Sequence, residues 1–146
     1  MENLDVNEII LTDLKKISTN GGNVLHYLKS TDEGFNKFGE VYFSWINKNS
    51  IKAWKKHTKM TLNLVVPLGK VKFVFHNPKQ PDVFREETIG EDNYKRLTVP
   101  PGIWFGFHGI SHESSLVANV SDILHDENEI LRVEQNYFSF IWSASK

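Results

Sequence analysis

The residues best suited to chemistry lie in one short run, IKAWKKH at residues 51–57. Successive side chains of an extended strand point to opposite faces, so a regular strand here would present Lys55 and His57 together. Its other face would then carry Lys52, Trp54 and Lys56. An imidazole titrates close to the pH at which a general base is most useful, and a desolvated lysine can hold an oxyanion or act as a base. Inside a closed sheet the pair would suit proton removal next to a carbonyl group, whereas on an outer face both would be ordinary solvated groups.

The rest of the chain indicates a sheet that could hold such a pair. Short apolar-rich runs alternate with turn residues such as Gly, Pro and Asn, a pattern typical of a β-sandwich or barrel. The predicted strands span residues 9–17, 24–29, 39–46, 51–57, 62–67, 70–76, 83–89, 96–99, 104–109 and 116–122. Weak helical spacing over residues 127–135 predicts a short C-terminal helical segment. The apolar run at 137–142 is expected to pack on the barrel or on a second subunit.

Length and composition favour one domain that spans residues 1–146. The 17 basic and 18 acidic residues leave a net charge of -1 with no dense basic stripe, which argues against a nucleic-acid partner. The chain has no cysteine, so disulfides, thiolate metal sites and a cysteine nucleophile are excluded. Neither a signal peptide nor an apolar run of about 20 residues is present. We therefore expect a cytoplasmic protein with no membrane partner.

A second informative stretch is Val99-Pro100-Pro101-Gly102, a tight turn into an aromatic strand. Together with the run at 51–57, this order resembles the sugar-nucleotide cupins, in particular the dTDP-4-dehydrorhamnose 3,5-epimerases and the dTDP-sugar 3,4-ketoisomerases. The resemblance covers residues 22–129. The ketoisomerase run Arg-Gly-x-His-Ala-His places its second histidine on His57, and Gly69 has the ketoisomerase spacing. The segment 125–129 looks like the family's closing His-Pro-x-x-Glu.

The resemblance implies an all-β fold, the double-stranded β-helix of the cupin or jelly-roll barrel. It also implies an enzyme that epimerises C3, C5 or both, or isomerises a 4-keto-6-deoxy nucleotide sugar through an enolate, for surface polysaccharide biosynthesis. No cofactor is expected, and the partners are a nucleotide-sugar ligand and a second copy of the chain in a homodimer. The expected site residues are His57 and Lys55 for catalysis and Lys52, Asn63, Glu40 and Asn119 for substrate binding.

Three departures from the family pattern leave an alternative open. Lys55 stands where the epimerases have their catalytic histidine, Ala118 lies near the position of their tyrosine acid, and Phe105 replaces the histidine after the Pro-x-Gly turn. Lys55 and Phe105 also stand where metal-binding cupins have histidine ligands, and Thr61 and its neighbours offer no glutamate. A transition ion needs about three protein ligands, so no metal is expected. The alternative is a non-catalytic sugar-nucleotide-binding cupin that has lost its acid and base. The retained His57, Lys52 and Gly69 favour the enzyme.

Overall fold

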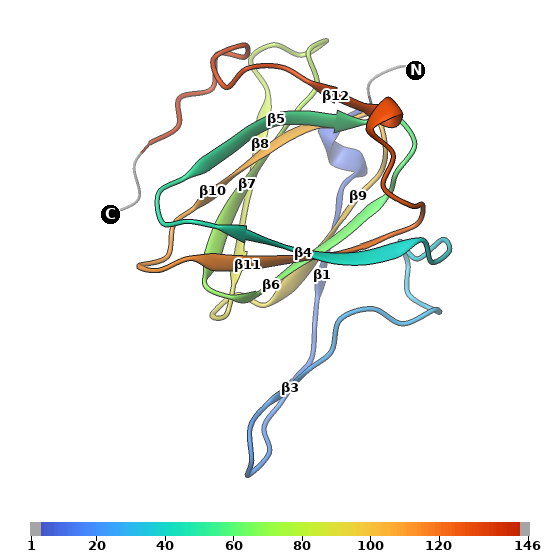
Figure 1. The fold of residues 1–146 in the computed structure, drawn as a ribbon, viewed down its shortest axis with the longest axis vertical. Coiled ribbons are helices and arrows are strands. Elements are labelled where there is room, and N and C mark those ends of the chain that lie inside the picture. The colour runs from blue at the N-terminus through green and yellow to red at the C-terminus, as the bar shows by residue number, and fades with distance from the viewer. Residues whose placement is uncertain (1–3, 144–146) are drawn as a thin grey trace.

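The computed structural model describes residues 4–143, and most of its regular structure is β-strand (Figure 1). The strands are β1 (Ile10–Asp13), β2 (Lys16–Ile17), β3 (Val24–Leu25), β4 (Glu40–Ile46), β5 (Ile51–His57), β6 (Leu62–Leu68), β7 (Lys70–His76), β8 (Phe84–Gly90), β9 (Lys95–Val99), β10 (Trp104–Gly109), β11 (Ser115–Ser121) and β12 (Ile130–Arg132). Two single turns of 3-10 helix, η1 (Val6–Glu8) and η2 (Glu127–Glu129), are the helices of the described residues. Neither turn has the length or the apolar character to cross a bilayer.

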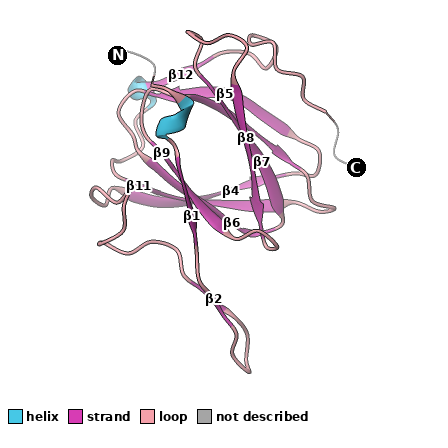
Figure 2. Cartoon of the chain, turned by 180° about the vertical axis from the view of Figure 1, so that it is seen from behind, coloured by secondary structure: helices cyan, strands magenta, loops and turns pink. Residues whose placement is uncertain are grey.

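The strands form two five-stranded antiparallel sheets that face each other (Figures 1 and 2). The first sheet has the order β1-β9-β6-β11-β4, and the second has the order β12-β5-β10-β7-β8. A third, two-stranded sheet consists of the β2–β3 hairpin, which projects away from the rest of the molecule. The predicted all-β class is therefore confirmed.

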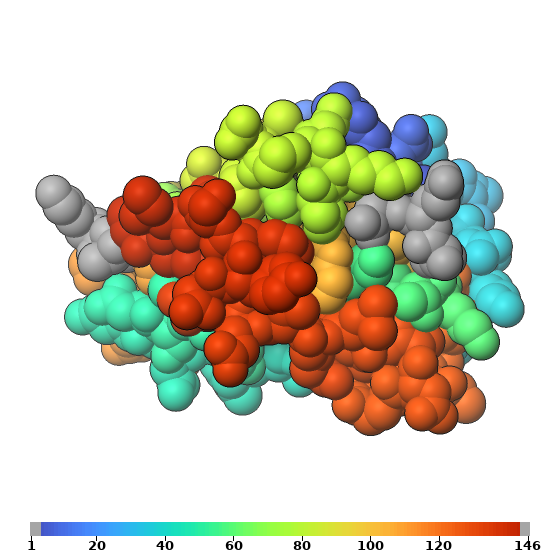
Figure 3. Space-filling model, turned by 90° about the horizontal axis from the view of Figure 1, so that it is seen from above, coloured from blue at the N-terminus to red at the C-terminus, as the bar shows by residue number. Residues whose placement is uncertain are grey.

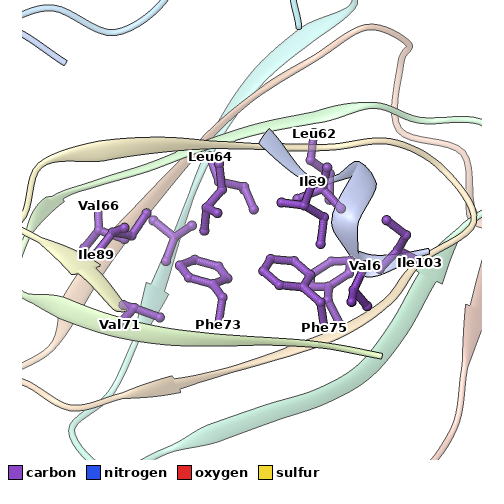
Figure 4. Close-up of a cluster of buried hydrophobic side chains, with 14 of the residues drawn as sticks. Val6, Ile9, Leu62, Leu64, Val66, Val71, Phe73, Phe75, Ile89 and Ile103 are labelled. Carbon is purple, nitrogen blue, oxygen red and sulfur yellow. The ribbon is translucent and has the colours of Figure 1, made fainter. Parts of the chain in front are cut away.

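Apolar side chains of the two facing sheets fill the space between them (Figure 4). Phe73 and Phe75 of β7 are 0% exposed, and burying a side chain of this size contributes about 1.5–3 kcal/mol. Val6, the first residue of η1, and Ile9, which directly follows this turn, join the same core. Arg85 fixes them by donating from Nη1 to their carbonyl oxygens at 2.9 and 2.8 Å. The first segment of the described chain thus closes one end of the core.

Two of the turn signals in the sequence have a steric origin. Gly69, between β6 and β7, has a φ of 87°, and a Cβ at this position would lie 2.2 Å from the Ser115 hydroxyl oxygen. Gly102, which ends the Pro-Pro-Gly turn before β10, has a φ of 93°. Only glycine adopts such backbone angles at low cost. Both turns fix where the following strand begins.

The N-terminal strands are shorter than predicted. The expected strand at 9–17 is divided into β1 and β2, and the expected strand at 24–29 retains regular pairing only at Val24–Leu25. The division occurs where the chain leaves the first sheet to form the projecting hairpin. Ile17 and Val24 at that hairpin are 44% and 49% exposed, so no core holds these residues in a longer strand.

The C-terminal helical segment predicted over 127–135 is wrong beyond its first turn. Only η2 is helical, and β12 follows it directly. β12 pairs antiparallel with β5, with Ile130 opposite His57 and Arg132 opposite Lys55. The backbone hydrogen bonds offered by the edge of β5 outweigh a weak helical spacing, because tertiary pairing overrides local propensity.

The aromatic C-terminal segment packs on the outer face of the second sheet. Of the two predicted arrangements, packing on the barrel or on a second subunit, the structure shows the first. Phe138, Phe140 and Trp142 surround Trp54, whose indole nitrogen donates to the Gln135 carbonyl oxygen at 2.9 Å. Figure 3 shows this segment in red spread over one face of the molecule. The segment is therefore part of the folded domain.

Candidate active site

An irregularity in β5 decides which side chains share a face. β5 pairs with β10, and the register shifts between Lys55, which is opposite Phe105, and Ala53, which is opposite Gly106. Trp54 is thus the extra residue of a β-bulge. Lys52 pairs with Phe107 and so lies on the same side as Lys55. A regular strand would have turned Lys52 to the opposite face, so that part of the alternation prediction is wrong.

Two adjoining cavities open on this side of β5. The outer cavity, of about 330 Å³, is lined by Ser44, Lys52, Ala53, Trp54, Lys55, Phe105, Phe107, Arg132 and Val133. The inner cavity, of about 40 Å³, is lined by Tyr42, Ser44, Lys55, His57, Leu62, Leu64, Phe105, Phe107, Val117 and Asn119. Lys55 belongs to both and so lies where they meet. The outer cavity is close to the smallest small-molecule sites, which begin at about 300 Å³, while the inner one is about the size of a water molecule.

His57 is held by a buried glutamate. Its Nδ1 is hydrogen-bonded to Oε2 of Glu129, and the side chains of the two residues are 3% and 1% exposed. The other oxygen of Glu129 accepts the backbone N–H groups of Lys59 and Met60 at 2.9 and 3.0 Å. A carboxylate can only accept, so Nδ1 carries the hydrogen and Nε2 keeps its lone pair. Within residues 4–143, Nε2 is buried and has no hydrogen-bond partner.

The pKa shifts of His57 and Glu129 favour a neutral imidazole beside an ionised carboxylate. Burial lowers the pKa of His57 below its ordinary value, although the hydrogen bond to Glu129 opposes the shift. Burial raises the pKa of Glu129, but the hydrogen bonds from His57 and the two backbone N–H groups outweigh it and leave the pKa below its ordinary value. At neutral pH the pair is therefore an imidazole with a free Nε2 beside a carboxylate, the state required of a general base.

Tyr42 and Asn119 lie in the inner cavity and are hydrogen-bonded to each other. Asn119 accepts the backbone N–H of Asn63 through Oδ1 at 3.0 Å and donates through Nδ2 to the Tyr42 hydroxyl at 3.0 Å. The hydroxyl also lies 3.8 Å from the Met60 sulfur, a weak acceptor. Burial raises the pKa of Tyr42, so the phenol retains its proton. The asparagine thus positions a protonated tyrosine in the cavity.

Three cationic side chains border the outer cavity. Arg132 makes two hydrogen bonds to Glu127, at 2.8 and 3.2 Å, and Lys52 donates to the Trp45 carbonyl oxygen at 2.8 Å. Lys55 is partly buried, and its pKa is lowered by burial and then by the charge of Arg132. In the described part of the chain, no hydrogen bond or ion pair holds its amino group. The cavity is therefore suited to an anionic ligand.

The structure brings four of the six expected site residues to these cavities. His57, Lys55 and Asn119 line the inner one, and Lys52 lines the outer one. Glu129 was not among the expected site residues, although it ends the segment that resembled the family's closing His-Pro-x-x-Glu. Tyr42 was not among them either. The partner of each is far away in the sequence, so no local signal assigned either residue a role.

Asn63 and Glu40 do not line either cavity. The Asn63 side chain accepts from the Thr98 hydroxyl at 2.6 Å and donates to the Gly34 carbonyl oxygen at 3.2 Å. Glu40 accepts the backbone N–H of His125 at 3.0 Å. Both side chains tie loops to the first sheet, and neither enters the chemistry considered below. Among residues 4–143, no three His, Cys, Asp or Glu side chains converge to form a metal site.

Comparison with known proteins gave matches only among solved structures. No protein-family model matches the sequence, and no curated protein matches it. The crystal structure of a dTDP-sugar isomerase from Desulfovibrio desulfuricans G20 is 34% identical, with a TM-score of 0.89, over 97% of this chain and 94% of that one.

Two further structures are similar in fold. A variant of the sugar 3,4-ketoisomerase QdtA from Thermoanaerobacterium thermosaccharolyticum, crystallised with TDP-4-keto-6-deoxyglucose, is 19% identical with a TM-score of 0.73, over 88% of this chain and 90% of that one. A dTDP-4-dehydrorhamnose 3,5-epimerase from Sulfolobus tokodaii is 21% identical with a TM-score of 0.79, over 97% and 84% of the two chains.

Proposed function

Because the chain belongs to the sugar-nucleotide cupin family of the dTDP-sugar isomerases, we propose that it epimerises or isomerises a 4-keto-6-deoxy nucleotide sugar. The reaction passes through an enolate and serves surface polysaccharide biosynthesis in the cytoplasm. The observation that carries this proposal is the free Nε2 of His57, held by Glu129, in a cavity shared with Lys55 and Tyr42. These are a base, a cation and an acid, the groups that proton transfer next to a ketone requires.

His57 is the base of the proposed reaction. Its Nε2 takes the proton from the carbon next to the ketone, and Glu129 stabilises the imidazolium that forms. Lys55, at the mouth of the inner cavity, donates to the ketone oxygen as negative charge develops there. A base of this kind accelerates proton transfer by about 10²–10⁴-fold.

Tyr42 is the proton donor in this scheme. It belongs to β4 of the first sheet, whereas His57 belongs to β5 of the second, so the two residues line the cavity from opposing sheets. A proton removed on one side of the sugar ring can therefore be returned on the other, which inverts the carbon. Tyr42 would thus replace the tyrosine acid that the epimerases have near the position of Ala118.

Tyr42→Phe is expected to separate proton removal from inversion. Deuterium from heavy water should still enter the sugar, because His57 and Glu129 are intact, while formation of the inverted or isomerised product should fall by about 10²-fold or more. Mass spectrometry measures the exchange, and NMR of the product measures the configuration. Equal loss of both activities would remove Tyr42 from the role of acid.

The outer cavity suits the diphosphate and sugar of the ligand. Lys52, Lys55 and Arg132 provide positive charge at its wall, and Phe105 and Phe107 provide apolar surface. The inner cavity is too small for a sugar ring and has room only for a carbonyl oxygen or a methyl group. The keto carbon is therefore expected to lie where the two cavities meet, beside Lys55.

Deuterium wash-in tests the proposal directly. The protein is incubated in heavy water with a panel of 4-keto nucleotide sugars, including TDP-4-keto-6-deoxyglucose, and exchange of carbon-bound hydrogen is followed by mass spectrometry. The enzyme should catalyse exchange into at least one member of the panel. Tight binding with no exchange into any of them would instead support the non-catalytic binding module, for which the replacements at Lys55 and Ala118 are the argument.

The pH dependence of this exchange is expected to reflect the burial of His57. Burial lowers the pKa of the imidazole below 6.5, so the base remains neutral further into the acid range than an exposed histidine would. Protonation of His57 should therefore slow exchange only when the pH drops below 6.5. An NMR titration of the His57 ring measures the midpoint, and a midpoint above that value would contradict the assignment.

We also propose that the chain forms a homodimer through the first sheet. β4 lies at the edge of that sheet, and its outward side chains Val41, Phe43 and Trp45 are 45%, 63% and 56% exposed. An apolar edge of this kind is normally covered by another chain. Light scattering at micromolar concentration should give the mass of two chains, and Phe43→Asp combined with Trp45→Asp should give one. A wild-type monomer, or a double variant that still dimerises, would contradict this interface.

A further inference from the structure

We propose that Lys55 is a covalent catalyst, whose amino group forms an imine with the ketone of the sugar. The inference rests on the proposed function and deepens it, since the intermediate becomes an enamine, the nitrogen counterpart of the enolate. Four described residues line both cavities: Ser44, Lys55, Phe105 and Phe107. Among these four, Lys55 carries the ionisable amine. Its side chain therefore lies at the boundary where the keto carbon of a bound sugar is expected.

The surroundings of Lys55 favour a nucleophilic amine. Phe105 and Phe107 border it with apolar surface, and Lys52 and Arg132 line the same cavity as neighbouring cations. Desolvation and nearby positive charge both disfavour the ammonium form, and they activate lysines for attack on carbonyl carbon. In the part of the chain that the structure describes, no carboxylate forms an ion pair with Lys55. The carboxylate of Glu127 is hydrogen-bonded to Arg132, and the charges of Glu127 and Glu129 oppose the lowering of the Lys55 pKa without cancelling it. The pKa of Lys55 is accordingly lowered, first by burial and then by Arg132.

The chemistry balances without an oxidant or reductant. The neutral amine adds to the keto carbon, a C–N bond forms, the C=O π bond breaks, and a proton passes from the nitrogen to the oxygen to give a carbinolamine. A second proton, taken from solvent and returned to it when the imine is hydrolysed, lets that oxygen leave as water and gives the protonated imine. The positive nitrogen then acidifies the adjacent C–H bond, and His57 Nε2 removes the proton while the electron pair forms the C=C bond of the enamine. Return of a proton to carbon, from Tyr42 or His57, and addition of water release the ketone and the free lysine.

The cation that remains on nitrogen explains how the site could operate with lysine at the position of the family's histidine. An enolate requires a donor to stabilise a developing negative oxygen, whereas an iminium ion already carries the positive charge on the substrate. His57 then needs to act only as a base, which its hydrogen bond to Glu129 supports. The replacement of a catalytic histidine by Lys55 is in this view a change of mechanism and not a loss of activity.

Reductive trapping tests the imine. The wild-type protein is mixed with TDP-4-keto-6-deoxyglucose, or with whichever 4-keto sugar of the panel exchanges, in the presence of sodium cyanoborohydride. Intact-mass spectrometry should then detect one added sugar nucleotide per chain, joined through a secondary amine, and peptide mapping should place it on Lys55. Lys55→Arg, which keeps the positive charge, should abolish the adduct and lower the exchange rate by about 10²-fold or more. Lys59→Arg, at an exposed neighbouring lysine, should form the adduct on Lys55 as the wild type does.

The same samples distinguish failure of the imine mechanism from failure of the proposed epimerase or isomerase function. Exchange without an adduct on Lys55, or exchange that survives in Lys55→Arg, would overturn the imine and leave the epimerase or isomerase function standing. An adduct that maps to another lysine would do the same. No exchange and no adduct with any keto sugar of the panel would overturn both.

Discussion

His57→Ala is expected to lower the rate of carbon–hydrogen exchange in the keto-sugar substrate by about 10²–10⁴-fold. Within residues 4–143, His57 is the imidazole that lines the inner cavity, and its Nε2 has no competing hydrogen-bond partner. Removal of the ring removes the proposed proton acceptor. The outer cavity, which is expected to bind the sugar and diphosphate, is left intact. The effect should therefore fall on the rate of exchange much more than on the affinity for the nucleoside diphosphate, which isothermal titration calorimetry measures in parallel.

A second substitution at this position keeps the experiment interpretable if the alanine variant is unstable. The carboxylate of Glu129 is 1% exposed and would lose a buried partner in His57→Ala, which is costly. His57→Asn retains an N–H donor for Glu129 but no base, so it should fold and still lose exchange. His112→Ala, on an exposed loop outside both cavities, is the matched control and should exchange at the wild-type rate. Wild-type exchange in a folded His57→Asn protein would rule out His57 as the base.

Trp54→Ala is expected to lower the free energy of unfolding by about 3–5 kcal/mol. The ring is 2% exposed, and it packs against Phe138, Phe140 and Trp142 with ring centroids 5.4, 6.3 and 5.3 Å away. Substitution removes this packing and also the hydrogen bond from the indole nitrogen to the Gln135 carbonyl oxygen. Urea denaturation followed by far-UV circular dichroism measures the loss. Because Trp54 anchors the C-terminal segment, proteolysis of that segment should also accelerate.

The control for this prediction lies in the same segment. Ile141 is 86% exposed, so Ile141→Ala should change the free energy of unfolding by no more than about 0.5 kcal/mol. A cost below about 1 kcal/mol for Trp54→Ala would mean that the segment does not depend on this ring, and the packing described above would not be what holds it in place.

Local sequence signals were reliable where one strand lies between two turns. The strands at 51–57 and 70–76 have the predicted bounds, because β-branched and aromatic residues favour extended backbone and Gly69 determines the turn between β6 and β7. The placement of Lys55 and His57 on one side of β5 also followed from the two-residue period of a strand. These features depend on neighbours in the chain, so the amino-acid sequence alone determined them.

The remaining parts of the site depend on contacts between distant segments. Lys52 joins Lys55 only because β10 pairs across the bulge at Trp54, and Glu129 reaches His57 only because β12 adds to the edge of β5. A local pattern contains no information about which strand supplies an edge or where an extra residue is accommodated, since both are set by the packing of the whole sheet. The sequence by itself thus determined that His57 and Lys55 share one side of a strand, and which strand carries them. The tertiary structure decided which carboxylate, which phenol and which cations surround them.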